Sequence, residues 1–241
     1  MPNTLKVGFF SLTEVGNGCD SEYNESRLFD NLRLEGMCWA RRWVATPELM
    51  ERRLFARGDL AKSQRVSLYL ISEPVTTALD EFQKLGRFFQ ARRSPLTGLF
   101  TLVKTYAAPR LTIDPDAILD WPNRGLFVTA QDRVEGATAA AFDEARQWYD
   151  EVHIPDLLGV HGAAGCWWFE AMPDAVMPDR PNPSGRTIRV YWLDEDPNAF
   201  LDDLRERTPG MSMMDLSNAY RTLLVGAYRT IPLESSFDWF D

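Results

Sequence analysis

Residues 187–194 read T-I-R-V-Y-W-L-D, and residues 65–72, which lie 122 positions earlier, read R-V-S-L-Y-L-I-S. Both runs are rich in β-branched and aromatic residues and are bounded by turn-forming or polar residues, which is typical of β-strands. The separation of 122 recurs in four pairs of identical residues: Tyr69 and Tyr191, Leu79 and Leu201, Asp80 and Asp202, and Tyr106 and Tyr228. Four such pairs in order predict that the chain contains one structural unit twice.

The elements around these two strands recur in the same order. In the first half we expect strands at 6–15, 36–44, 65–72 and 100–106, and helices at about 21–30 and 76–89. In the second half we expect strands at 124–131, 162–170, 187–194 and 222–229, and helices at about 139–152 and 199–207. A β-α-β-β-α-β order gives an antiparallel sheet with both helices on one face, the ferredoxin-like arrangement.

We therefore predict an α+β fold of two tandem ferredoxin-like units, residues 1–115 and 116–241. The sheet face that the helices leave uncovered must be buried. Two sheets packed face to face, or closed into an α+β barrel, would bury it and leave a central cavity for a small-molecule substrate. The barrel could close within one chain as an intramolecular pseudo-dimer, or across a homodimer.

The two units differ in one segment. Gly8 and Gly125 are separated by 117 positions, Asp30 and Asp150 by 120, and Gly36 and Gly162 by 126. The step from 120 to 126 indicates that the first unit lacks six residues, which correspond to 151–156 of the second unit. This segment includes His153, so we expect one site per chain.

The composition restricts the partners. A net charge of −9 and a sequence pI near 4.9 disfavour nucleic acid and anionic membrane surfaces. Cys19, Cys38 and Cys166 are an odd number without C-x-x-C spacing, which predicts reduced thiols in a cytoplasmic protein. Motifs for metal, dinucleotide or serine-hydrolase sites are missing from the sequence, so we expect no metal and no cofactor.

The segment W-Y-D-E-V-H-I-P-D-L-L-G-V-H-G at 148–162, followed by C-W-W-F-E at 166–170, resembles the dimeric α+β barrel superfamily, in particular its EthD-type and small cyclase or isomerase members. The resemblance implies that His153 points into the barrel cavity. A tandem ferredoxin-like chain of this length also resembles the haem-binding chlorite dismutase group, although no motif specific to that group is present.

His153 is the leading catalytic candidate, because an imidazole that titrates near neutrality can take or deliver a proton. Pro155 is expected to end its helix. Asp150 precedes His153 by three positions and could orient the ring, although Asp30 stands at the matching position without a histidine. Phe29 likewise matches Tyr149. The alternative is that His153 only anchors the end of the helix.

The remaining candidates surround the expected cavity. His161 could be a second polar group at its mouth. Trp167 and Trp168 should face opposite sides of their strand, and Arg41 and Arg42 match them in the first unit; an inward arginine could hold a carboxylate or phenolate. Tyr191 and Tyr228 could donate hydroxyl hydrogen bonds to a substrate. Each of these residues could instead serve the architecture alone.

The sequence leads to three hypotheses about the function of the protein. The leading hypothesis is a cofactor-independent lyase, dehydratase, isomerase or cyclase that acts on a small hydrophobic or aromatic metabolite through His153. The second is an oxidative enzyme, either a cofactor-free monooxygenase or a haem enzyme similar to chlorite dismutase. The third is a non-catalytic protein that binds a hydrophobic ligand.

Overall fold

A computed structural model of the protein describes residues 5–14, 33, 35–72, 75–84, 96–172 and 185–231. The strands of the first half are β1 (Leu5–Thr13), β2 (Met37–Val44), the short β3 (Phe55–Ala56), β4 (Arg65–Ser72) and β5 (Leu96–Ala107). Those of the second half are β6 (Gly125–Arg133), β7 (Ala163–Ala171), β8 (Thr187–Leu193) and β9 (Tyr220–Thr230). All eight expected strands are therefore present. Their first and last residues agree with the predicted ones to within two positions, except that β5 begins four residues earlier than expected.

The strands form one antiparallel sheet in the order β2-β4-β1-β5-β7-β8-β6-β9-β3. Each half contributes four neighbouring strands in the ferredoxin-like order, β2-β4-β1-β5 and β7-β8-β6-β9. The halves meet where β5 pairs with β7, and again where Trp43 and Val44 of β2 pair with Thr230 and Arg229 of β9. These two junctions close eight strands into a ring within one chain.

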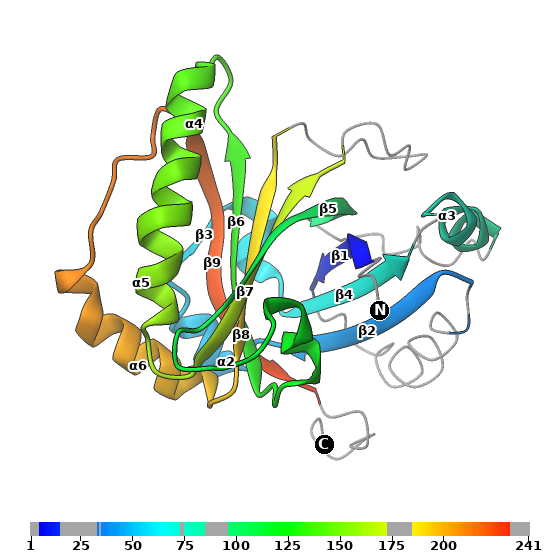
Figure 1. Ribbon diagram of the computed structural model, residues 1–241, viewed down its shortest axis with the longest axis horizontal. Helices are drawn as coiled ribbons and strands as arrows, with labels where there is room; N and C mark the ends of the chain where they lie inside the picture. The colour runs from blue at the N-terminus through cyan, green and yellow to red at the C-terminus, as the bar shows by residue number, and fades with distance from the viewer. Residues whose placement is uncertain are drawn as a thin grey trace.

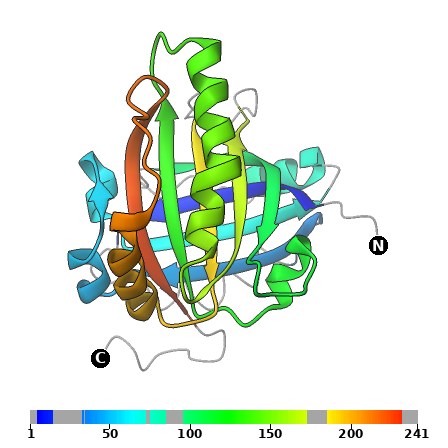
Figure 2. The ribbon, with the colours of Figure 1, turned by 60° about the vertical axis from the view of Figure 1, so that its left-hand side comes forward.

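Helices cover the outside of this ring (Figures 1 and 2). In the second half, α4 (Ala139–Trp148) continues through a π-helical turn, η4 (Tyr149–His153), into α5 (Ile154–Leu158), and α6 (Pro197–Arg207) lies beside β9. In the first half, α3 (Val75–Lys84) contacts β4, and α2 (Pro47–Glu51) lies in the loop after β2. Three 3-10 turns, 58–62, 115–120 and 208–210, complete the described elements.

Pro155 does not end its helix, contrary to the expectation. It occupies the first turn of α5, directly after the π-helical turn. Proline interrupts a regular α-helix because its ring meets the carbonyl four residues earlier and because it lacks an N–H. A wider π-helical turn accommodates the interruption, so the chain runs on to Leu158.

Matching details recur at the second strands of the two halves. Gly36 and Gly162, which precede β2 and β7, have φ values of 83° and 87°, a region that favours glycine. The carbonyl of Gly36 accepts from the Ser72 N–H at 2.8 Å, and that of Gly162 accepts from the Asp194 N–H at 3.0 Å. The register then shifts between Met37 and Trp39 and likewise between Ala163 and Gly165.

The strand pairing corrects two of the predicted equivalences. Phe9 lies opposite Tyr69, and Phe127 lies opposite Tyr191, so Gly125 matches Val7 and not Gly8. Tyr106 and Tyr228 are not equivalent either, since Phe100 faces Gly8 where Tyr228 faces Leu126. Matching residues of the last strands, β5 and β9, are therefore 128 positions apart (228 − 100), and not 122 as the identical tyrosines indicated. The second half has six additional residues before its last strand.

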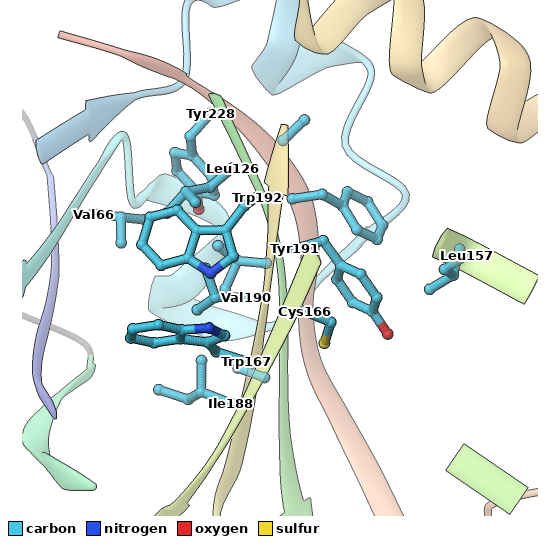
Figure 3. Packing of buried hydrophobic residues seen from close by; sticks show 14 of the residues in the cluster. Val66, Leu126, Leu157, Cys166, Trp167, Ile188, Val190, Tyr191, Trp192 and Tyr228 are labelled. Carbon is cyan, nitrogen blue, oxygen red and sulfur yellow. The ribbon is translucent and has the colours of Figure 1, made fainter. Parts of the chain in front are cut away.

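The interior of the ring is a packed aromatic core. Trp43, Trp167, Trp192, Phe10, Phe100 and Phe169 are fully buried, and their rings meet at centroid distances such as 5.4 Å between Trp167 and Trp192. Trp167, Ile188 and Trp192 gather on one side of β7 and β8, whereas Cys166 and Tyr191 point to the other side (Figure 3). Among the described residues, large rings occupy the place where the sequence predicted a central cavity.

Several sequence predictions lie outside the described residues, namely the helix at about 21–30, with Phe29 and Asp30, and Cys19. The end of the helix predicted at 76–89 lies there too. No helix of the described residues has both the length and the apolar character that crossing a bilayer requires.

Candidate functional site

The π-helical turn places two aromatic rings over the outer face of β8. The Tyr149 side chain is buried, and the His153 imidazole stacks on Trp148 with centroids 4.6 Å apart and planes 21° apart. The Tyr149 ring meets the imidazole edge-on at 5.3 Å. Single π-helical turns are often found at functional sites. Here the turn directs His153 into the layer between helix and sheet, which corrects the expectation that it points into the barrel.

Arg189 of β8 lies under this turn and is fully buried. Its guanidinium carbon is 3.4 Å from the ring centroid of Tyr149, 4.1 Å from that of Trp168 and 5.6 Å from that of Tyr220. Cation–π contacts of this kind stabilise a desolvated arginine by about 2 kcal/mol, far less than the cost of burying its charge. The arginine therefore requires further polar partners.

One protein partner is a neutral amide. The Nη1 of Arg189 donates to Oε1 of the buried Gln131 on β6 at 2.8 Å. The Nε and Nη2 atoms of Arg189 have no hydrogen-bond partner within the described part of the chain, and neither do Nδ1 of His153 and Nε1 of Trp168. Several buried polar groups without partners thus gather in one layer, although most buried polar groups in proteins are paired.

The charge of Arg189 is also not neutralised. None of the ion pairs within the described ranges includes Arg189. The nearby carboxylate of Glu170 instead pairs with Arg146, whose guanidinium carbon lies 5.3 Å from the Trp168 ring centroid. By contrast, Arg186 on the flank of β8 donates to both carboxylate oxygens of Asp132.

The environment sets the protonation of His153. Burial, and secondarily the positive charge of Arg189, lower the pKa of His153 to about 4. The imidazole is therefore neutral at pH 7 and able to accept a proton. Burial raises the pKa values of Tyr149 and Tyr191, so both phenols are protonated at neutral pH.

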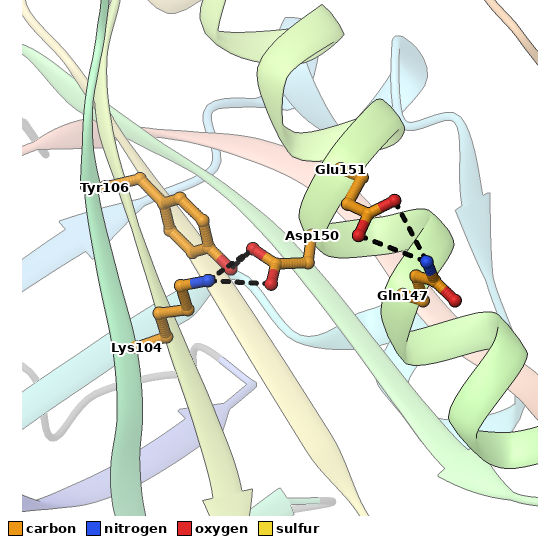
Figure 4. Close-up of polar contacts among 5 residues, drawn as sticks. All are labelled: Lys104, Tyr106, Gln147, Asp150 and Glu151. Atoms are coloured by element: carbon orange, nitrogen blue, oxygen red, sulfur yellow. Dashed lines mark hydrogen bonds and ion pairs between the residues drawn. The ribbon is translucent and has the colours of Figure 1, made fainter.

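Asp150 lies at the rim of this layer and points toward Lys104 and Tyr106 of β5 (Figure 4). It accepts from Lys104 at 2.6 and 2.7 Å and from the Tyr106 hydroxyl at 2.8 Å. Burial raises the pKa of Asp150, but the hydrogen bonds from Lys104 and Tyr106 outweigh that effect and leave it lowered. These contacts tie the π-helical turn to the first half of the chain. A catalytic role for Asp150 stays a prediction.

The other sequence candidates divide between the two faces of the sheet. Trp168 and Tyr191 share the helix-facing side with Tyr149 and His153, and Trp167 faces the interior, as the alternation predicted. Tyr228 lies on the interior side, where its hydroxyl is 3.3 Å from Nη2 of Arg53. The structure does not bring Trp167 and Tyr228 together with His153.

Arg41, Arg42 and His161 also lie apart from the layer. The guanidinium carbon of Arg41 is 5.4 Å from the Trp39 ring centroid, on the interior side of β2. The buried Arg42 faces outward in the first half and donates to the Ser67 hydroxyl at 3.2 Å. The His161 side chain is exposed, and its backbone N–H donates to Asp203 at 2.6 Å. Their functional roles stay predictions.

Sequence reasoning missed Arg189, Gln131 and Tyr220. One signal was available for Arg189: a charged residue stands in the centre of the otherwise apolar strand T-I-R-V-Y-W-L, with the same parity as Tyr191. The 122-residue separation also pairs Arg189 with Ser67 (189 − 67), so the matching position of the first half holds a serine. Gln131 and Tyr220 gave no comparable signal, because only the pairing of distant strands brings them close.

No protein-family model matches this sequence, and no curated protein matches it in sequence. Solved structures are similar in fold. DypB of Rhodococcus jostii in complex with haem is 11% identical, with a TM-score of 0.54 over 96% of this chain and 95% of that chain. A protein described as a candidate chlorite dismutase is 13% identical, with a TM-score of 0.50 over 95% of this chain and 96% of the other. These likenesses support the ferredoxin-like α+β fold.

Proposed function

We propose that the layer between the π-helical turn and β8 binds a small, hydrophobic or aromatic anion, and that His153 takes a proton from it. The observation that carries the proposal is Arg189, which is fully buried, has two nitrogens without partners and forms no ion pair within the described chain. An uncompensated buried charge costs several kcal/mol, and a bound anion would offset that cost.

The neighbouring groups suit a proton transfer. Neutral His153 is the base, and the cation of Arg189 favours the negative charge that develops on the ligand when a proton leaves an acidic C–H or O–H. Positive charge on His153 is disfavoured beside Arg189 alone, but an anion between them removes this repulsion. The rings of Tyr149, Trp168 and Tyr220 provide the aromatic surroundings for the ligand's apolar part.

Deprotonation is the first step of two reaction classes. Return of the proton to another atom of the ligand gives an isomerase reaction. Attack of the carbanion on a carbonyl of the same molecule, with the proton delivered to the resulting alkoxide, gives a cyclase reaction, and departure of a leaving group that takes up the proton gives a lyase reaction. Capture of the carbanion by dioxygen gives a cofactor-free oxidation, in which dioxygen is the oxidant. The proton-transfer step is the part that the geometry of His153 and Arg189 supports, and it is common to both classes.

A haem-dependent oxidation is a second candidate, because the structures of similar fold include DypB with haem. A haem requires an axial ligand and a flat space beside it. His153 lies between the rings of Trp148 and Tyr149, and Tyr149 lies directly against Arg189. These residues do not fit a haem, because Trp148 stacks on the imidazole and Tyr149 packs edge-on against it, where the macrocycle would have to lie. A hemin titration that produces a Soret band dependent on His153 would overturn this conclusion.

Hydrogen exchange tests the proposed proton transfer without knowledge of the natural substrate. We expect the protein to accelerate exchange of acidic C–H hydrogens for deuterium in aromatic 2-oxo acids, followed by proton NMR in deuterated water. His153→Gln should abolish the acceleration, whereas His161→Gln, which changes an exposed side chain, should preserve it. Oxygen uptake with the same acids separates the oxidative outcome. Equal exchange rates with wild type and His153→Gln would refute the role of His153.

We further infer that the two halves, residues 1–115 and 116–241, are diverged copies of one unit that form an intramolecular pseudo-dimer. The support is the repeated strand order, the shared left-handed glycines Gly36 and Gly162, and the register shift at the same place in β2 and β7. On this inference the anion site belongs to the second copy only, because Ser67 stands where the second copy has Arg189. Sedimentation of a monomer with full ligand binding would agree with closure within one chain.

A further inference from the structure

We infer that the anionic group of the ligand is a carboxylate, bound side-on by the Nε and Nη2 atoms of Arg189, and that Gln131 orients this edge. The inference rests on the proposed anion site and specifies its ligand class. It depends on which guanidinium atoms lack a hydrogen-bond partner among the described residues, and on the chemistry of Gln131, whose amide oxygen accepts from Nη1.

The free atoms of Arg189 form one edge of the guanidinium. Its Nη1 is engaged with Gln131, while Nε and Nη2 have no partner among the described residues. Nε–H and one N–H of Nη2 point in the same direction, and this fork matches the two oxygens of a carboxylate. A phenolate or enolate has one oxygen and would satisfy only one of the two donors.

The contacts of Arg189 with its neighbours determine the direction from which a ligand would reach this edge. Tyr149 and Trp168 lie against the guanidinium at 3.4 and 4.1 Å, and Nη1 is held by the amide. A partner therefore has to approach Nε and Nη2 in the guanidinium plane. A carboxylate is planar and can do so while its attached apolar group contacts the rings.

Gln131 fixes the orientation of the guanidinium without neutralising it. Its Oε1 accepts from Arg189, and its Nε2 donates to the Thr222 hydroxyl at 3.3 Å. An arginine can only donate, so the amide oxygen must face it. Glutamate at position 131 would have the same shape and would supply a counter-charge. The neutral amide leaves the single positive charge of Arg189 for the ligand.

Charge matching favours a carboxylate over a phosphate monoester, which can also bind an arginine in a bidentate manner. Arg189 is the fully buried cation of this layer, and Arg146 at the rim is paired with Glu170. A dianionic phosphate in this layer would keep an uncompensated negative charge, which is costly away from water. A monoanion leaves no such excess.

The test compares four ligands on one ring system: 2-naphthoate, 2-naphthol, 2-naphthyl phosphate and the neutral 2-naphthamide, with acetate and benzoate as smaller acids. Binding is measured by calorimetry and by quenching of tryptophan fluorescence. We expect at least one acid of the series to bind, and naphthoate to bind more than about tenfold more tightly than the amide and the phosphate. Failure of all three acids to bind would overturn the inference.

Two variants separate the carboxylate inference from the proposed anion site. Gln131→Glu supplies an internal carboxylate and should weaken naphthoate binding by more than about tenfold while it raises the melting temperature. Arg189→Lys keeps the charge but removes the fork, so naphthoate should lose its advantage over 2-naphthol at a pH where the latter is ionised.

The outcomes are distinct. Arg189-dependent binding of naphtholate or of the phosphate, without preference for naphthoate, would overturn the carboxylate inference and leave the anion site standing. Binding of all four ligands with equal affinity in wild type and Arg189→Met would overturn both. Tight naphthoate binding in Gln131→Glu would show that the fork of Arg189 is not the receptor.

Discussion

Trp168 on β7 and Arg189 on β8 lie directly opposite each other on the helix-facing side of the sheet. At the corresponding pair in the first half, Arg42 on β2 lies opposite Ser67 on β4. Each half thus places one buried arginine at this cross-strand position, but on different strands. Arg42 donates to the hydroxyl opposite it, whereas Arg189 faces an indole ring that cannot accept. The two arginines therefore differ: Arg42 has a hydroxyl partner on the opposite strand, whereas Nε and Nη2 of Arg189 have no hydrogen-bond partner among the described residues.

This contrast predicts the effect of removing the charge. Arg189→Met should leave the free energy of unfolding unchanged or raise it, because an uncompensated buried cation is replaced by an apolar side chain of similar length. Arg186→Met is the matched control, since it leaves the partly buried Asp132 with fewer partners and should destabilise by roughly 2 kcal/mol. Urea unfolding measures both. A larger loss of stability in Arg189→Met than in Arg186→Met would contradict the unpaired state of Arg189.

His153 predicts how stability depends on pH. Its pKa is lowered from 6.5 to about 4 in the folded protein, so the unfolded chain binds the proton more readily. The contribution of His153 to the free energy of unfolding is complete above pH 6.5 and is lost as pH falls through about 4. The difference between the unfolded and folded pKa values corresponds to a loss of about 3 kcal/mol in that free energy. His153→Phe, which keeps an aromatic ring beside Trp148, should remove this part of the pH dependence in urea midpoints measured from pH 7.5 to 4.

A carboxylate ligand should shift this titration. An anion beside Arg189 reduces the repulsion of imidazolium, so saturating naphthoate should raise the pKa of His153 toward its ordinary value. NMR of the His153 imidazole protons with and without the ligand measures the change. An unchanged His153 titration in the presence of bound ligand would place the ligand elsewhere.

Asp150 predicts how the π-helical turn is held. Asp150→Asn should cost about 1 kcal/mol, because it weakens the contacts to Lys104 and Tyr106 at a partly exposed site. Part of the loss should disappear at high salt, since the Lys104 pair is half exposed. Glu151→Gln, one residue further and exposed, is the control and should change little. Hydrogen exchange of the amides at 149–154 should rise only in Asp150→Asn.

The sequence predicted the strands well because alternation and β-branched or aromatic content mark them locally. It did not predict the π-helical turn, whose position depends on how Tyr149 and His153 pack on a distant strand. It also treated Tyr106 and Tyr228 as equivalent. Identical residues 122 positions apart do not reveal the six-residue insertion that is evident from the strand pairing. The sequence also did not predict which side of β7 faces the helices. Alternation along the strand places Trp167 and Trp168 on opposite sides, but only the fold determines that Trp168 contacts the helical turn.

The site was predicted in part for the same reason. His153 and Tyr149 belong to one segment, so a local motif identified both. Arg189 and Gln131 stand on strands 58 positions apart in the chain, and their hydrogen bond depends on the β6–β8 pairing. A charged residue within an apolar strand is a usable signal, because a buried arginine needs partners.

The shared left-handed glycines give a final prediction about the two halves. Gly162→Ala adds a Cβ at φ 87° that would lie 2.8 Å from Cβ of Glu195, and Gly36→Ala adds one at φ 83° that would lie 3.3 Å from Cβ of Ala78. Both substitutions are strained and should destabilise by more than about 1 kcal/mol, Gly162→Ala the more. Gly210→Ala, where an added Cβ meets nothing within 4 Å, is the control. Because Gly162 directly precedes the strand that holds Trp168, Gly162→Ala should also weaken naphthoate binding, whereas Gly36→Ala, at the same place in the first half, should leave that binding unchanged.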